Sequence, residues 1–235
     1  MIPWIKSARD FPPVDNALDE PSGLLCMGGN LEPETVLTAY SRGIFPWYSD
    51  DQPILWWSPD PRMVLFADEL KISKSLSKTI RANKFEIRFD TAFAEVITAC
   101  AEPRSPGLGT WILPEMQAAY MRLHQIGFAH SAEAWRDGKL VGGLYGIAMG
   151  HMFYGESMFA RETDASKVAF VALVEKLKAD GFELIDCQQE TRHLASFGAR
   201  PIPRKQFTQR LQELITLNSD NSPTSYWKTT DLPSP

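Results

Sequence analysis

The sequence is poor in cysteine, and none of its apolar stretches is long enough to cross a membrane. Its three cysteines, Cys26, Cys100 and Cys187, are too few and too scattered for a disulfide scaffold. No Cys-x-x-Cys pair or His/Cys cluster has the spacing of a zinc site, so we expect neither a metal nor a cofactor. The longest apolar stretch, residues 141–149, contains three glycines and falls short of the roughly 18 residues of a membrane span.

The sequence also lacks an export signal and an excess of positive charge. Its first residues, MIPWIKSARDFPP, have no apolar core of the signal-peptide kind, so we expect a cytoplasmic protein without membrane contacts. Lys and Arg number 24 against 29 Asp and Glu, a net charge of −5, which argues against a general nucleic-acid coat but not against a local basic patch. The 235 residues, 44% hydrophobic and 23% charged, are typical of one large folded domain or two small ones.

Tryptophan and proline concentrate before residue 115. Within the first 62 residues the pattern predicts one helix, opened by Pro33 and ended by Gly43, with short loops or strands around it. We interpret residues 1–62 as a small N-terminal domain packed on a larger domain, residues 63–235.

The larger domain alternates between strand and helix patterns. Strands are predicted at 63–66, 84–89, 129–135, 140–147, 152–158 and 182–188. Helices are predicted at 72–82, 91–100, 114–126, 164–180, 193–197 and 203–215, and Asp164 is expected to cap the fourth of them. The dipeptide Asp137-Gly138 predicts a hairpin between two of the strands. The fold class is therefore α+β, with a mixed central sheet flanked by helices.

Two of the predicted strands carry an acid among apolar residues. In strand 182–188, alternation places Asp186 and Gln188 on one face, and a buried carboxylate is costly unless it is paired or lies at a cleft. In strand 152–158, Glu156 shares a face with aromatic Tyr154, unless Gly155 introduces a bulge. These acids are either solvated strand ends or members of one cleft that serves acid–base chemistry or receives a cation.

A basic segment and several tryptophans suggest binding surfaces. The segment 71–84 holds five cations and no acid, and a helix there would present a ridge suited to phosphates, or simply a solvated face. Four tryptophans lie among loops and prolines, where they are either core residues or a platform for stacking a base. These four are Trp47, Trp56, Trp57 and Trp111.

A series of short motifs runs through about residues 22–211. In order they are GGNLEPETVLTAYSRGIFPWY, WWSPDPR, TWI at 110–112, AHSAEAW, LVGGLYG, FYGESMF, DASK and LIDCQ. Together they resemble the leucyl/phenylalanyl-tRNA–protein transferases. The chain departs from the family's usual residues at Asn30, Ala160 and Asp164, and at Leu144, where a Met often lines the amino-acid pocket.

The resemblance implies a fold and a reaction. The fold is a small N-terminal domain joined to a domain of the GCN5-related acetyltransferase (GNAT) type. The reaction moves Leu or Phe, and less readily Met, from aminoacyl-tRNA to a protein that begins with Arg or Lys, which marks that protein for degradation as an N-degron. An aminoacyl ester is already activated, so the reaction needs positioning, loss of one proton and stabilisation of an oxyanion. We expect the enzyme to act as a monomer.

The resemblance also implies roles for individual residues. Asp186 would polarise or orient Gln188 near the attacking amine, and Glu156 would hold this network or the acceptor. The aminoacyl group and the terminal adenosine would contact Trp47, Trp111, Leu144, Phe153, Met158, Leu173 and Ile185. The acceptor-stem phosphates would contact Lys71, Lys74, Lys78, Arg81 and Lys84.

Three other functions remain open from the residues alone. An acyl-CoA-dependent N-acetyltransferase is disfavoured because the chain has no pyrophosphate loop of the Arg/Gln-x-x-Gly-x-Gly/Ala type. A non-catalytic RNA-binding module leaves the acids Asp186 and Glu156 without a purpose. A glycosidase with paired carboxylates leaves the basic segment 71–84 unexplained.

Overall fold

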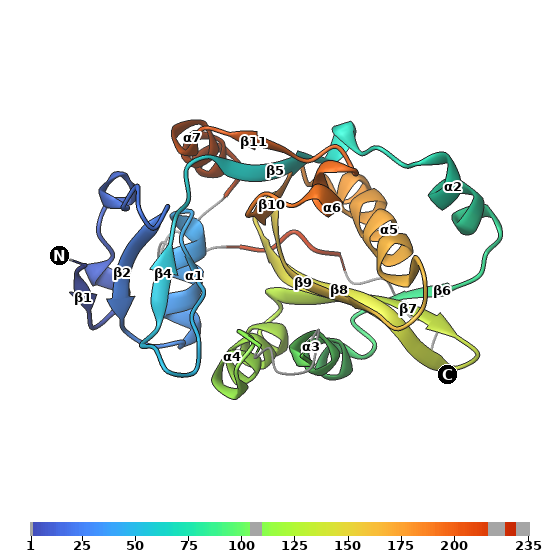
Figure 1. Cartoon of the computed structure of the whole chain (residues 1–235), viewed down its shortest axis with the longest axis horizontal. Helices are drawn as coiled ribbons and strands as arrows, with labels where there is room; N and C mark the ends of the chain where they lie inside the picture. The colour runs from blue at the N-terminus through green and yellow to red at the C-terminus, as the bar shows by residue number, and fades with distance from the viewer. Residues whose placement is uncertain (1, 104–109, 216–223, 229–235) are drawn as a thin grey trace.

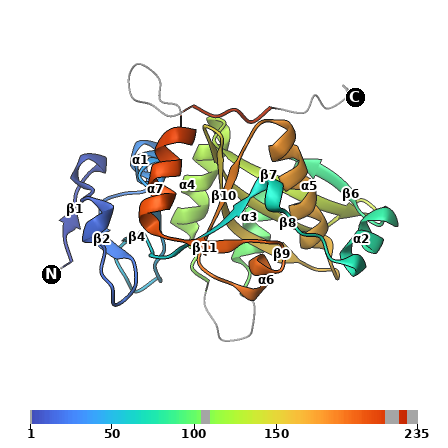
Figure 2. The same cartoon turned by 90° about the horizontal axis from the view of Figure 1, so that it is seen from above.

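The computed structural model describes residues 2–103, 110–215 and 224–228 and arranges their strands in two sheets. In Figure 1 the smaller sheet lies at one end of the molecule and the larger one fills the centre. Figure 2 shows the same arrangement from above, with α7 between the smaller sheet and the centre of the larger one.

The smaller sheet has the strand order β1-β2-β4-β3 and is built from very short strands. Its members are β1 (Trp4–Ile5), β2 (Leu24–Gly28), β3 (Phe45–Pro46) and β4 (Leu55–Trp57), preceded or joined by the 3-10 turns Ala8–Asp10 and Val14–Asn16. Helix α1 (Pro33–Ser41) begins with a proline in its first turn, and Gly43 follows it with φ +77°, as the sequence predicted. Three of these strands have only two or three residues and carry no periodic signal, so the sequence did not place them.

The larger sheet has seven strands in the order β11-β5-β10-β9-β8-β7-β6. Among these described strands only the β9–β10 pair is parallel, and α5 (Ala165–Ala179) connects its two members. The predicted mixed sheet is therefore confirmed. The strands are β5 (Arg62–Phe66), β6 (Glu86–Phe89), β7 (Ala129–Arg136), β8 (Lys139–Met149), β9 (Met152–Ala160), β10 (Leu184–Gln188) and β11 (Arg200–Ile202).

Helices cover both faces of the larger sheet. In Figure 1, α3 (Phe93–Ala101) and α4 (Pro114–Gln125) lie below the sheet, and α5 lies above it with α2 (Lys74–Arg81) packed beside it. A short 3-10 turn at Ala67–Glu69, α6 (Arg192–Ala195) and α7 (Arg204–Leu214) complete the described helices. One hydrophobic core lies on each face, and the core on the α3–α4 side also includes the residues of the smaller sheet.

Local geometry confirms one turn prediction and corrects one cap. Asp137 and Gly138 have φ values of +50° and +72°, which form the predicted hairpin between β7 and β8. Asp164 stands at the start of α5, but its φ is +66° and its carboxylate caps no helix N–H. That carboxylate instead accepts hydrogen bonds from Lys167 at 2.8 Å and Thr79 at 3.3 Å, which ties α5 to α2.

Two bulges break the alternation that the sequence predicted for β9 and β10. On β8, Tyr145 pairs with Ser157 and Gly146 pairs with Gly155, so Glu156 is the extra residue of β9. As a result Met158 packs on the α5 side of the sheet with Phe153, and not on the side of Tyr154 as strict alternation required. On β10 the register shifts after Asp186, and Gln188 has φ +60°.

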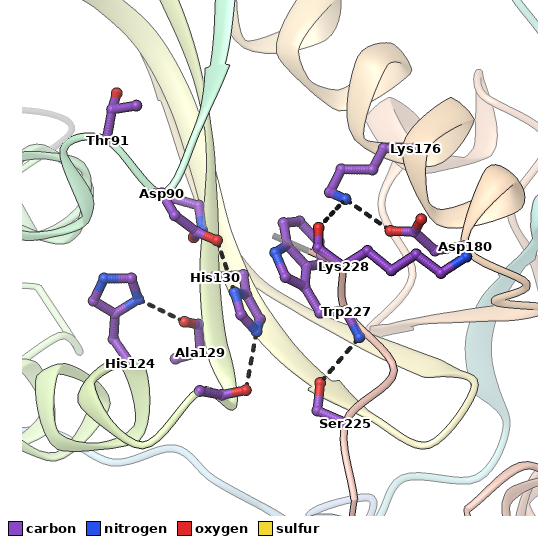
Figure 3. Close-up of polar contacts among 12 residues, drawn as sticks. Asp90, Thr91, His124, Ala129, His130, Lys176, Asp180, Ser225, Trp227 and Lys228 are labelled. Atoms are coloured by element: carbon purple, nitrogen blue, oxygen red, sulfur yellow. Dashed lines mark hydrogen bonds and ion pairs between the residues drawn. The ribbon is translucent and has the colours of Figure 1, made fainter. Parts of the chain in front are cut away.

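The C-terminal residues 224–228 lie against the end of the sheet at His130, as Figure 3 shows. Gly150 donates its N–H to the carbonyl of Thr224 at 2.6 Å. The ring of Trp227 stacks on His130 at 4.2 Å, and the Nζ of Lys176 lies 4.5 Å above the same ring. This segment therefore connects the start of β7 to α5.

Candidate functional site

A pocket of about 550 Å³ opens between β3, the middle of β8 and β9, the end of β10, and helices α5 and α6. We call it the central pocket. Its lining residues come from segments that are far apart in sequence. They are Phe45, Pro46, Trp47, Trp111, Leu144, Gly155, Glu156, Ser157, Met158, Ser166, Phe170, Ile185, Cys187, Gln188, Gln189, Thr191, His193 and Leu194.

The structure brings most of the predicted site residues together around the central pocket, and it places three of them away from its lining. Seven predicted residues line the central pocket, namely Trp47, Trp111, Leu144, Glu156, Met158, Ile185 and Gln188. Phe153 and Leu173 are not among the lining residues, and both side chains lie in the core cluster that also contains Leu144 and Ile185. Asp186 does not line it either, because its side chain is fully buried.

Asp186 is bound to an arginine and to the backbone at the end of its own strand. Its carboxylate accepts two hydrogen bonds from Arg62, from Nε at 2.8 Å and from Nη2 at 2.6 Å. It also accepts the backbone N–H of Gln188 at 2.9 Å. Asp186 therefore contacts the main chain of Gln188, not the side-chain amide that the sequence interpretation assigned to it.

Arg62 is a functional candidate that the sequence patterns did not single out. Its side chain is fully buried, and its guanidinium lies between the rings of Phe45 at 4.8 Å and Phe207 at 4.6 Å. Its Nη1 donates to the carbonyl of Gly43 at 3.1 Å. The sequence feature that could have identified it is its position as the last residue of the motif WWSPDPR, directly before the apolar strand 63–66.

Glu156 sits among hydroxyl groups and an amide. Its Oε1 accepts from Tyr40 at 2.7 Å and from the Nε2 of Gln188 at 3.1 Å, and its Oε2 lies 2.9 Å from the hydroxyl of Tyr120. Burial raises the pKa of Glu156 from its ordinary value of 4.5 to about 7, against the opposing effect of the two tyrosine hydroxyls. Both tyrosines are completely buried. The sequence analysis did not single them out, although Tyr40 lies within the first of the quoted motifs.

The tryptophans divide into two kinds. Trp56 and Trp57 are core residues whose indole N–H groups donate to the carbonyls of Gly28 at 2.9 Å and Trp47 at 2.6 Å. Trp47 stays 40% exposed and packs edge-on against Trp57, and the half-buried Trp111 also lines the central pocket. The stacking interpretation therefore remains for Trp47 and Trp111, and the core interpretation holds for the other two.

The basic segment 71–84 contains the amphipathic helix α2, whose Leu76 is buried against the α5 side of the sheet. Its five cations are all exposed and none lines the central pocket, so the segment forms a separate surface. Lys84 makes an ion pair with Glu162 at 3.2 Å. The others with exposed side chains are Lys71, Lys74, Lys78 and Arg81.

The described residues offer neither a cluster of metal ligands nor a membrane-spanning helix. Across residues 2–103, 110–215 and 224–228, no three His, Cys, Asp or Glu side chains gather in a way that could hold a metal ion. Within the same ranges no helix is long and apolar enough to cross a membrane.

Comparison with known proteins identifies the family. The family model for leucyl/phenylalanyl-tRNA protein transferase matches residues 64–212, and the model for the N-terminal domain of that transferase matches residues 29–60. Among solved structures, L-PGS from Bacillus licheniformis aligns with 77% of this chain and 62% of its own at 11% identity, with a TM-score of 0.39. That score is too low to establish a shared fold.

Curated relatives agree with the family models over nearly the whole chain. The leucyl/phenylalanyl-tRNA–protein transferase of Chromobacterium violaceum is 62% identical over 92% of this chain and 92% of its own length. That of Aromatoleum aromaticum is 62% identical over 88% of this chain and 87% of its own. That of Stutzerimonas stutzeri is 57% identical over 97% of this chain and 100% of its own. The motifs, the family models and these relatives together place the chain in the leucyl/phenylalanyl-tRNA–protein transferase family.

Proposed function

We propose that the enzyme transfers Leu or Phe, and less readily Met, from aminoacyl-tRNA to the N-terminal α-amine of proteins that begin with Arg or Lys. The product would be marked for degradation as an N-degron, and a monomer would carry out the reaction in the cytoplasm. The observation that supports this most is the central pocket itself. It combines two accessible tryptophans, an apolar interior and the hydrogen-bonded pair Glu156–Gln188.

The donor would occupy the central pocket with its adenosine and its side chain on different walls. Trp47 and Trp111 present faces on which the terminal adenosine stacks or packs. Leu144, Met158 and Ile185 supply the apolar surface for the amino-acid side chain. Side chains without a branch at Cβ enter such a pocket with least strain, although one methyl group discriminates by only about 1–3 kcal/mol.

The acceptor amine would attack next to Gln188. The amine nitrogen bonds to the ester carbonyl carbon, the bond from that carbon to the ribose oxygen breaks, and one proton leaves the nitrogen while the ribose oxygen gains one. Gln188 is the candidate catalytic residue because its amide lines the pocket, where it orients the amine. Asp186 is a positioning residue that acts on Gln188 through the backbone N–H, with its charge compensated by Arg62.

The basic segment 71–84 would contact the phosphates of the acceptor stem without reading sequence. Its exposed cations are suited to such contacts, since they lie on one short helix and its flanks. The contacting residues would be Lys71, Lys74, Lys78, Arg81 and Lys84.

We further propose that residues 1–62 form an N-terminal domain and that residues 63–235 have a GNAT-like fold. The parallel strands β9 and β10, joined by α5, support the second assignment. The continuous core that joins the smaller sheet to the larger one means that such domains would fold as one unit.

A transfer assay tests the function directly. Purified enzyme is mixed with labelled Leu-tRNA and one of two peptides that differ only in an N-terminal Arg or Ala, without ATP. Label on the Arg peptide and little on the Ala peptide is expected. Equal labelling of both would contradict the acceptor rule, and no labelling of either with tRNA binding intact would contradict the assignment of the central pocket.

A further inference from the structure

Three oxygen-bearing side chains close a ring beside the central pocket. The hydroxyls of Tyr40 and Tyr120 are 2.6 Å apart, Tyr40 is 2.7 Å from Oε1 of Glu156, and Tyr120 is 2.9 Å from Oε2. The three residues come from α1, α4 and β9. We call this arrangement the tyrosine–glutamate ring.

The number of protons in the ring fixes its charge. Each of the three oxygen–oxygen contacts is a hydrogen bond only if one proton lies in it. The two tyrosine hydroxyls supply two protons, so the third must belong to Glu156. Oε1 also accepts from the amide of Gln188 at 3.1 Å, so Oε1 is the carbonyl oxygen and Oε2 carries the proton. With that proton on Oε2, Glu156 donates to Tyr120, Tyr120 to Tyr40, and Tyr40 to Oε1. With an ionised Glu156, Tyr120 instead donates to Oε2, and the contact between the two tyrosine hydroxyls lacks a proton.

The surroundings of Glu156 also favour the neutral acid. The groups that face it from other elements are Tyr40, Tyr120, Tyr145, Asp186 and Arg62, and the last two compensate each other's charge. Among the described residues none makes an ion pair with Glu156. Burial without a counter-ion disfavours the carboxylate, and this burial is what raises the pKa of Glu156 to about 7.

We propose that Glu156 is a neutral acid while the pocket is empty. When an acceptor binds, its positively charged N-terminal residue displaces the proton of Glu156 and takes the resulting carboxylate as counter-ion. This inference rests on the proposed function, because it names the group that recognises the acceptor. The O–H bond of Glu156 breaks, the proton goes to solvent, and the cation takes its place with no change of oxidation state. Both tyrosines then donate to the carboxylate, so the contact between their two hydroxyls no longer holds a proton and opens.

This coupling would make acceptor binding selective and dependent on pH. Ionising Glu156 costs free energy that only a nearby positive charge offsets, so neutral ligands gain nothing from the site. Because each binding event releases one proton, the affinity for a cationic acceptor rises about tenfold per pH unit below pH 7 and levels off above it.

Infrared spectroscopy of the empty enzyme, labelled with ¹³C at the glutamate carboxyls, tests the resting state. We expect a protonated-carboxyl band at pH 6 that disappears with a midpoint near 7 and is missing from Glu156→Gln. Tyr48→Phe is the matched control, since Tyr48 donates to Glu115 at 2.9 Å outside the ring, and it should keep the band. Tyr120→Phe, which removes the acceptor of the proton on Glu156, should shift the band. No such band at pH 6 would overturn the proposal.

Calorimetry with a short peptide that begins with Arg, at pH 6 in two buffers of different ionisation enthalpy, tests the displacement. The wild type should release about one proton more than Glu156→Gln, and the release should fall with a midpoint near pH 7. Equal release by both proteins, or a midpoint near the ordinary α-amine pKa of about 8, would overturn the proposal. Label transfer to the Arg peptide without this proton release would refute the displacement and leave the proposed function standing. A peptide that does not bind would refute both the displacement and the acceptor rule, while the infrared band still decides the state of Glu156.

Discussion

At the scale of single residues, the charge of Asp186 is compensated inside the protein by one guanidinium. The Arg62–Asp186 pair is fully buried, while the Arg200–Glu69 pair, with an Nε–Oε2 distance of 3.0 Å, is half exposed at the neighbouring strand. Removing one member of a buried pair leaves an uncompensated charge, which costs about 3–5 kcal/mol, whereas an exposed pair contributes about 0–1 kcal/mol.

Urea denaturation should therefore separate the two arginines. Arg62→Met is expected to lower the free energy of unfolding by about 3–5 kcal/mol and the matched control Arg200→Met by less than about 1 kcal/mol. Asp186→Asn combined with Arg62→Met removes both charges and should recover part of the loss. A double variant that is no more stable than Arg62→Met would show that packing of Arg62, not charge, decides its effect.

The pKa of Glu156 predicts how stability depends on pH. The folded protein keeps Glu156 neutral up to a pKa of about 7, whereas the unfolded chain ionises it near the ordinary value of 4.5. The unfolded state is thus favoured progressively as pH rises between these values, and the penalty is complete above pH 7. Glu156→Gln cannot ionise, so the melting temperature of the variant minus that of the wild type should increase between pH 5 and pH 8. A difference that stays constant over this range would contradict the shifted pKa, and Tyr48→Phe should show no such trend.

Sequence reasoning identified the polar residues of the site but not their partners. Asp186, Gln188 and Glu156 are visible because a charged or polar group interrupts an apolar strand. Arg62 lies 124 positions from Asp186, and Tyr40 lies 116 positions from Glu156, so only the folded chain joins them. In the sequence, a tyrosine on the apolar stripe of a helix cannot be distinguished from an ordinary core residue, because the acid that its hydroxyl contacts is far away along the chain.

At the scale of elements, periodicity placed the helices and long strands well but could not place the bulges. A single extra residue reverses which face each later side chain takes, and in β9 only the glycine at Gly155, next to the extra residue Glu156, indicated where a bulge could lie. Yet the bulge in β9 and the register shift in β10 are what bring Glu156 and Gln188 within 3.1 Å. The site therefore depends on the irregular positions of two otherwise predictable strands.

The cations of helix α2 give a testable prediction for tRNA binding. Lys74, Lys78 and Arg81 together changed to Gln should weaken tRNA binding. The slope of log affinity against log salt should also fall by about one unit for each phosphate that the variant no longer neutralises. The control changes Lys6 and Arg9, two exposed cations of the N-terminal segment, to Gln. Binding measured from low to moderate salt checks both, and an unchanged slope in the triple variant would remove α2 from the tRNA interface.

At the scale of the whole molecule, the central pocket depends on parts that the sequence assigned to two domains. The core on the α3–α4 face is one cluster of buried side chains, whose members come from segments between Ile5 and Leu214. Arg62, at the expected boundary, forms hydrogen bonds to both Gly43 and Asp186. The change from an irregular region to alternating strand and helix patterns suggested a boundary near residue 62, but such patterns do not report which side chains share a core. The tyrosine–glutamate ring likewise needs α1, α4 and β9 at once.

Substitutions in the segment 224–228 show whether the stability of the molecule can be changed without changing the rate of Leu transfer. Trp227 packs on His130 and beneath Lys176, whose Nζ also donates to the carbonyl of Lys228 at 2.7 Å (Figure 3). Trp227→Ala removes a half-buried ring and should cost about 2 kcal/mol of unfolding free energy, less than the loss for a fully buried tryptophan. Tyr226→Ala, which removes an exposed ring stacked on His151, should cost less.

Because Trp227 lies outside the central pocket, its removal should leave kcat/KM for Leu transfer within about twofold at temperatures well below the melting point. Urea denaturation and initial rates on the same preparations check the two quantities together. A large fall in kcat/KM at full folding would mean that the clamp on β7 and α5 also sets the geometry of the pocket. Phe153 would then transmit the effect of Trp227 to the central pocket, since its ring faces Trp227 at 6.2 Å and it lies two residues before the lining residue Gly155. A second substitution, Phe153→Leu, should then reproduce the kinetic defect with Trp227 in place.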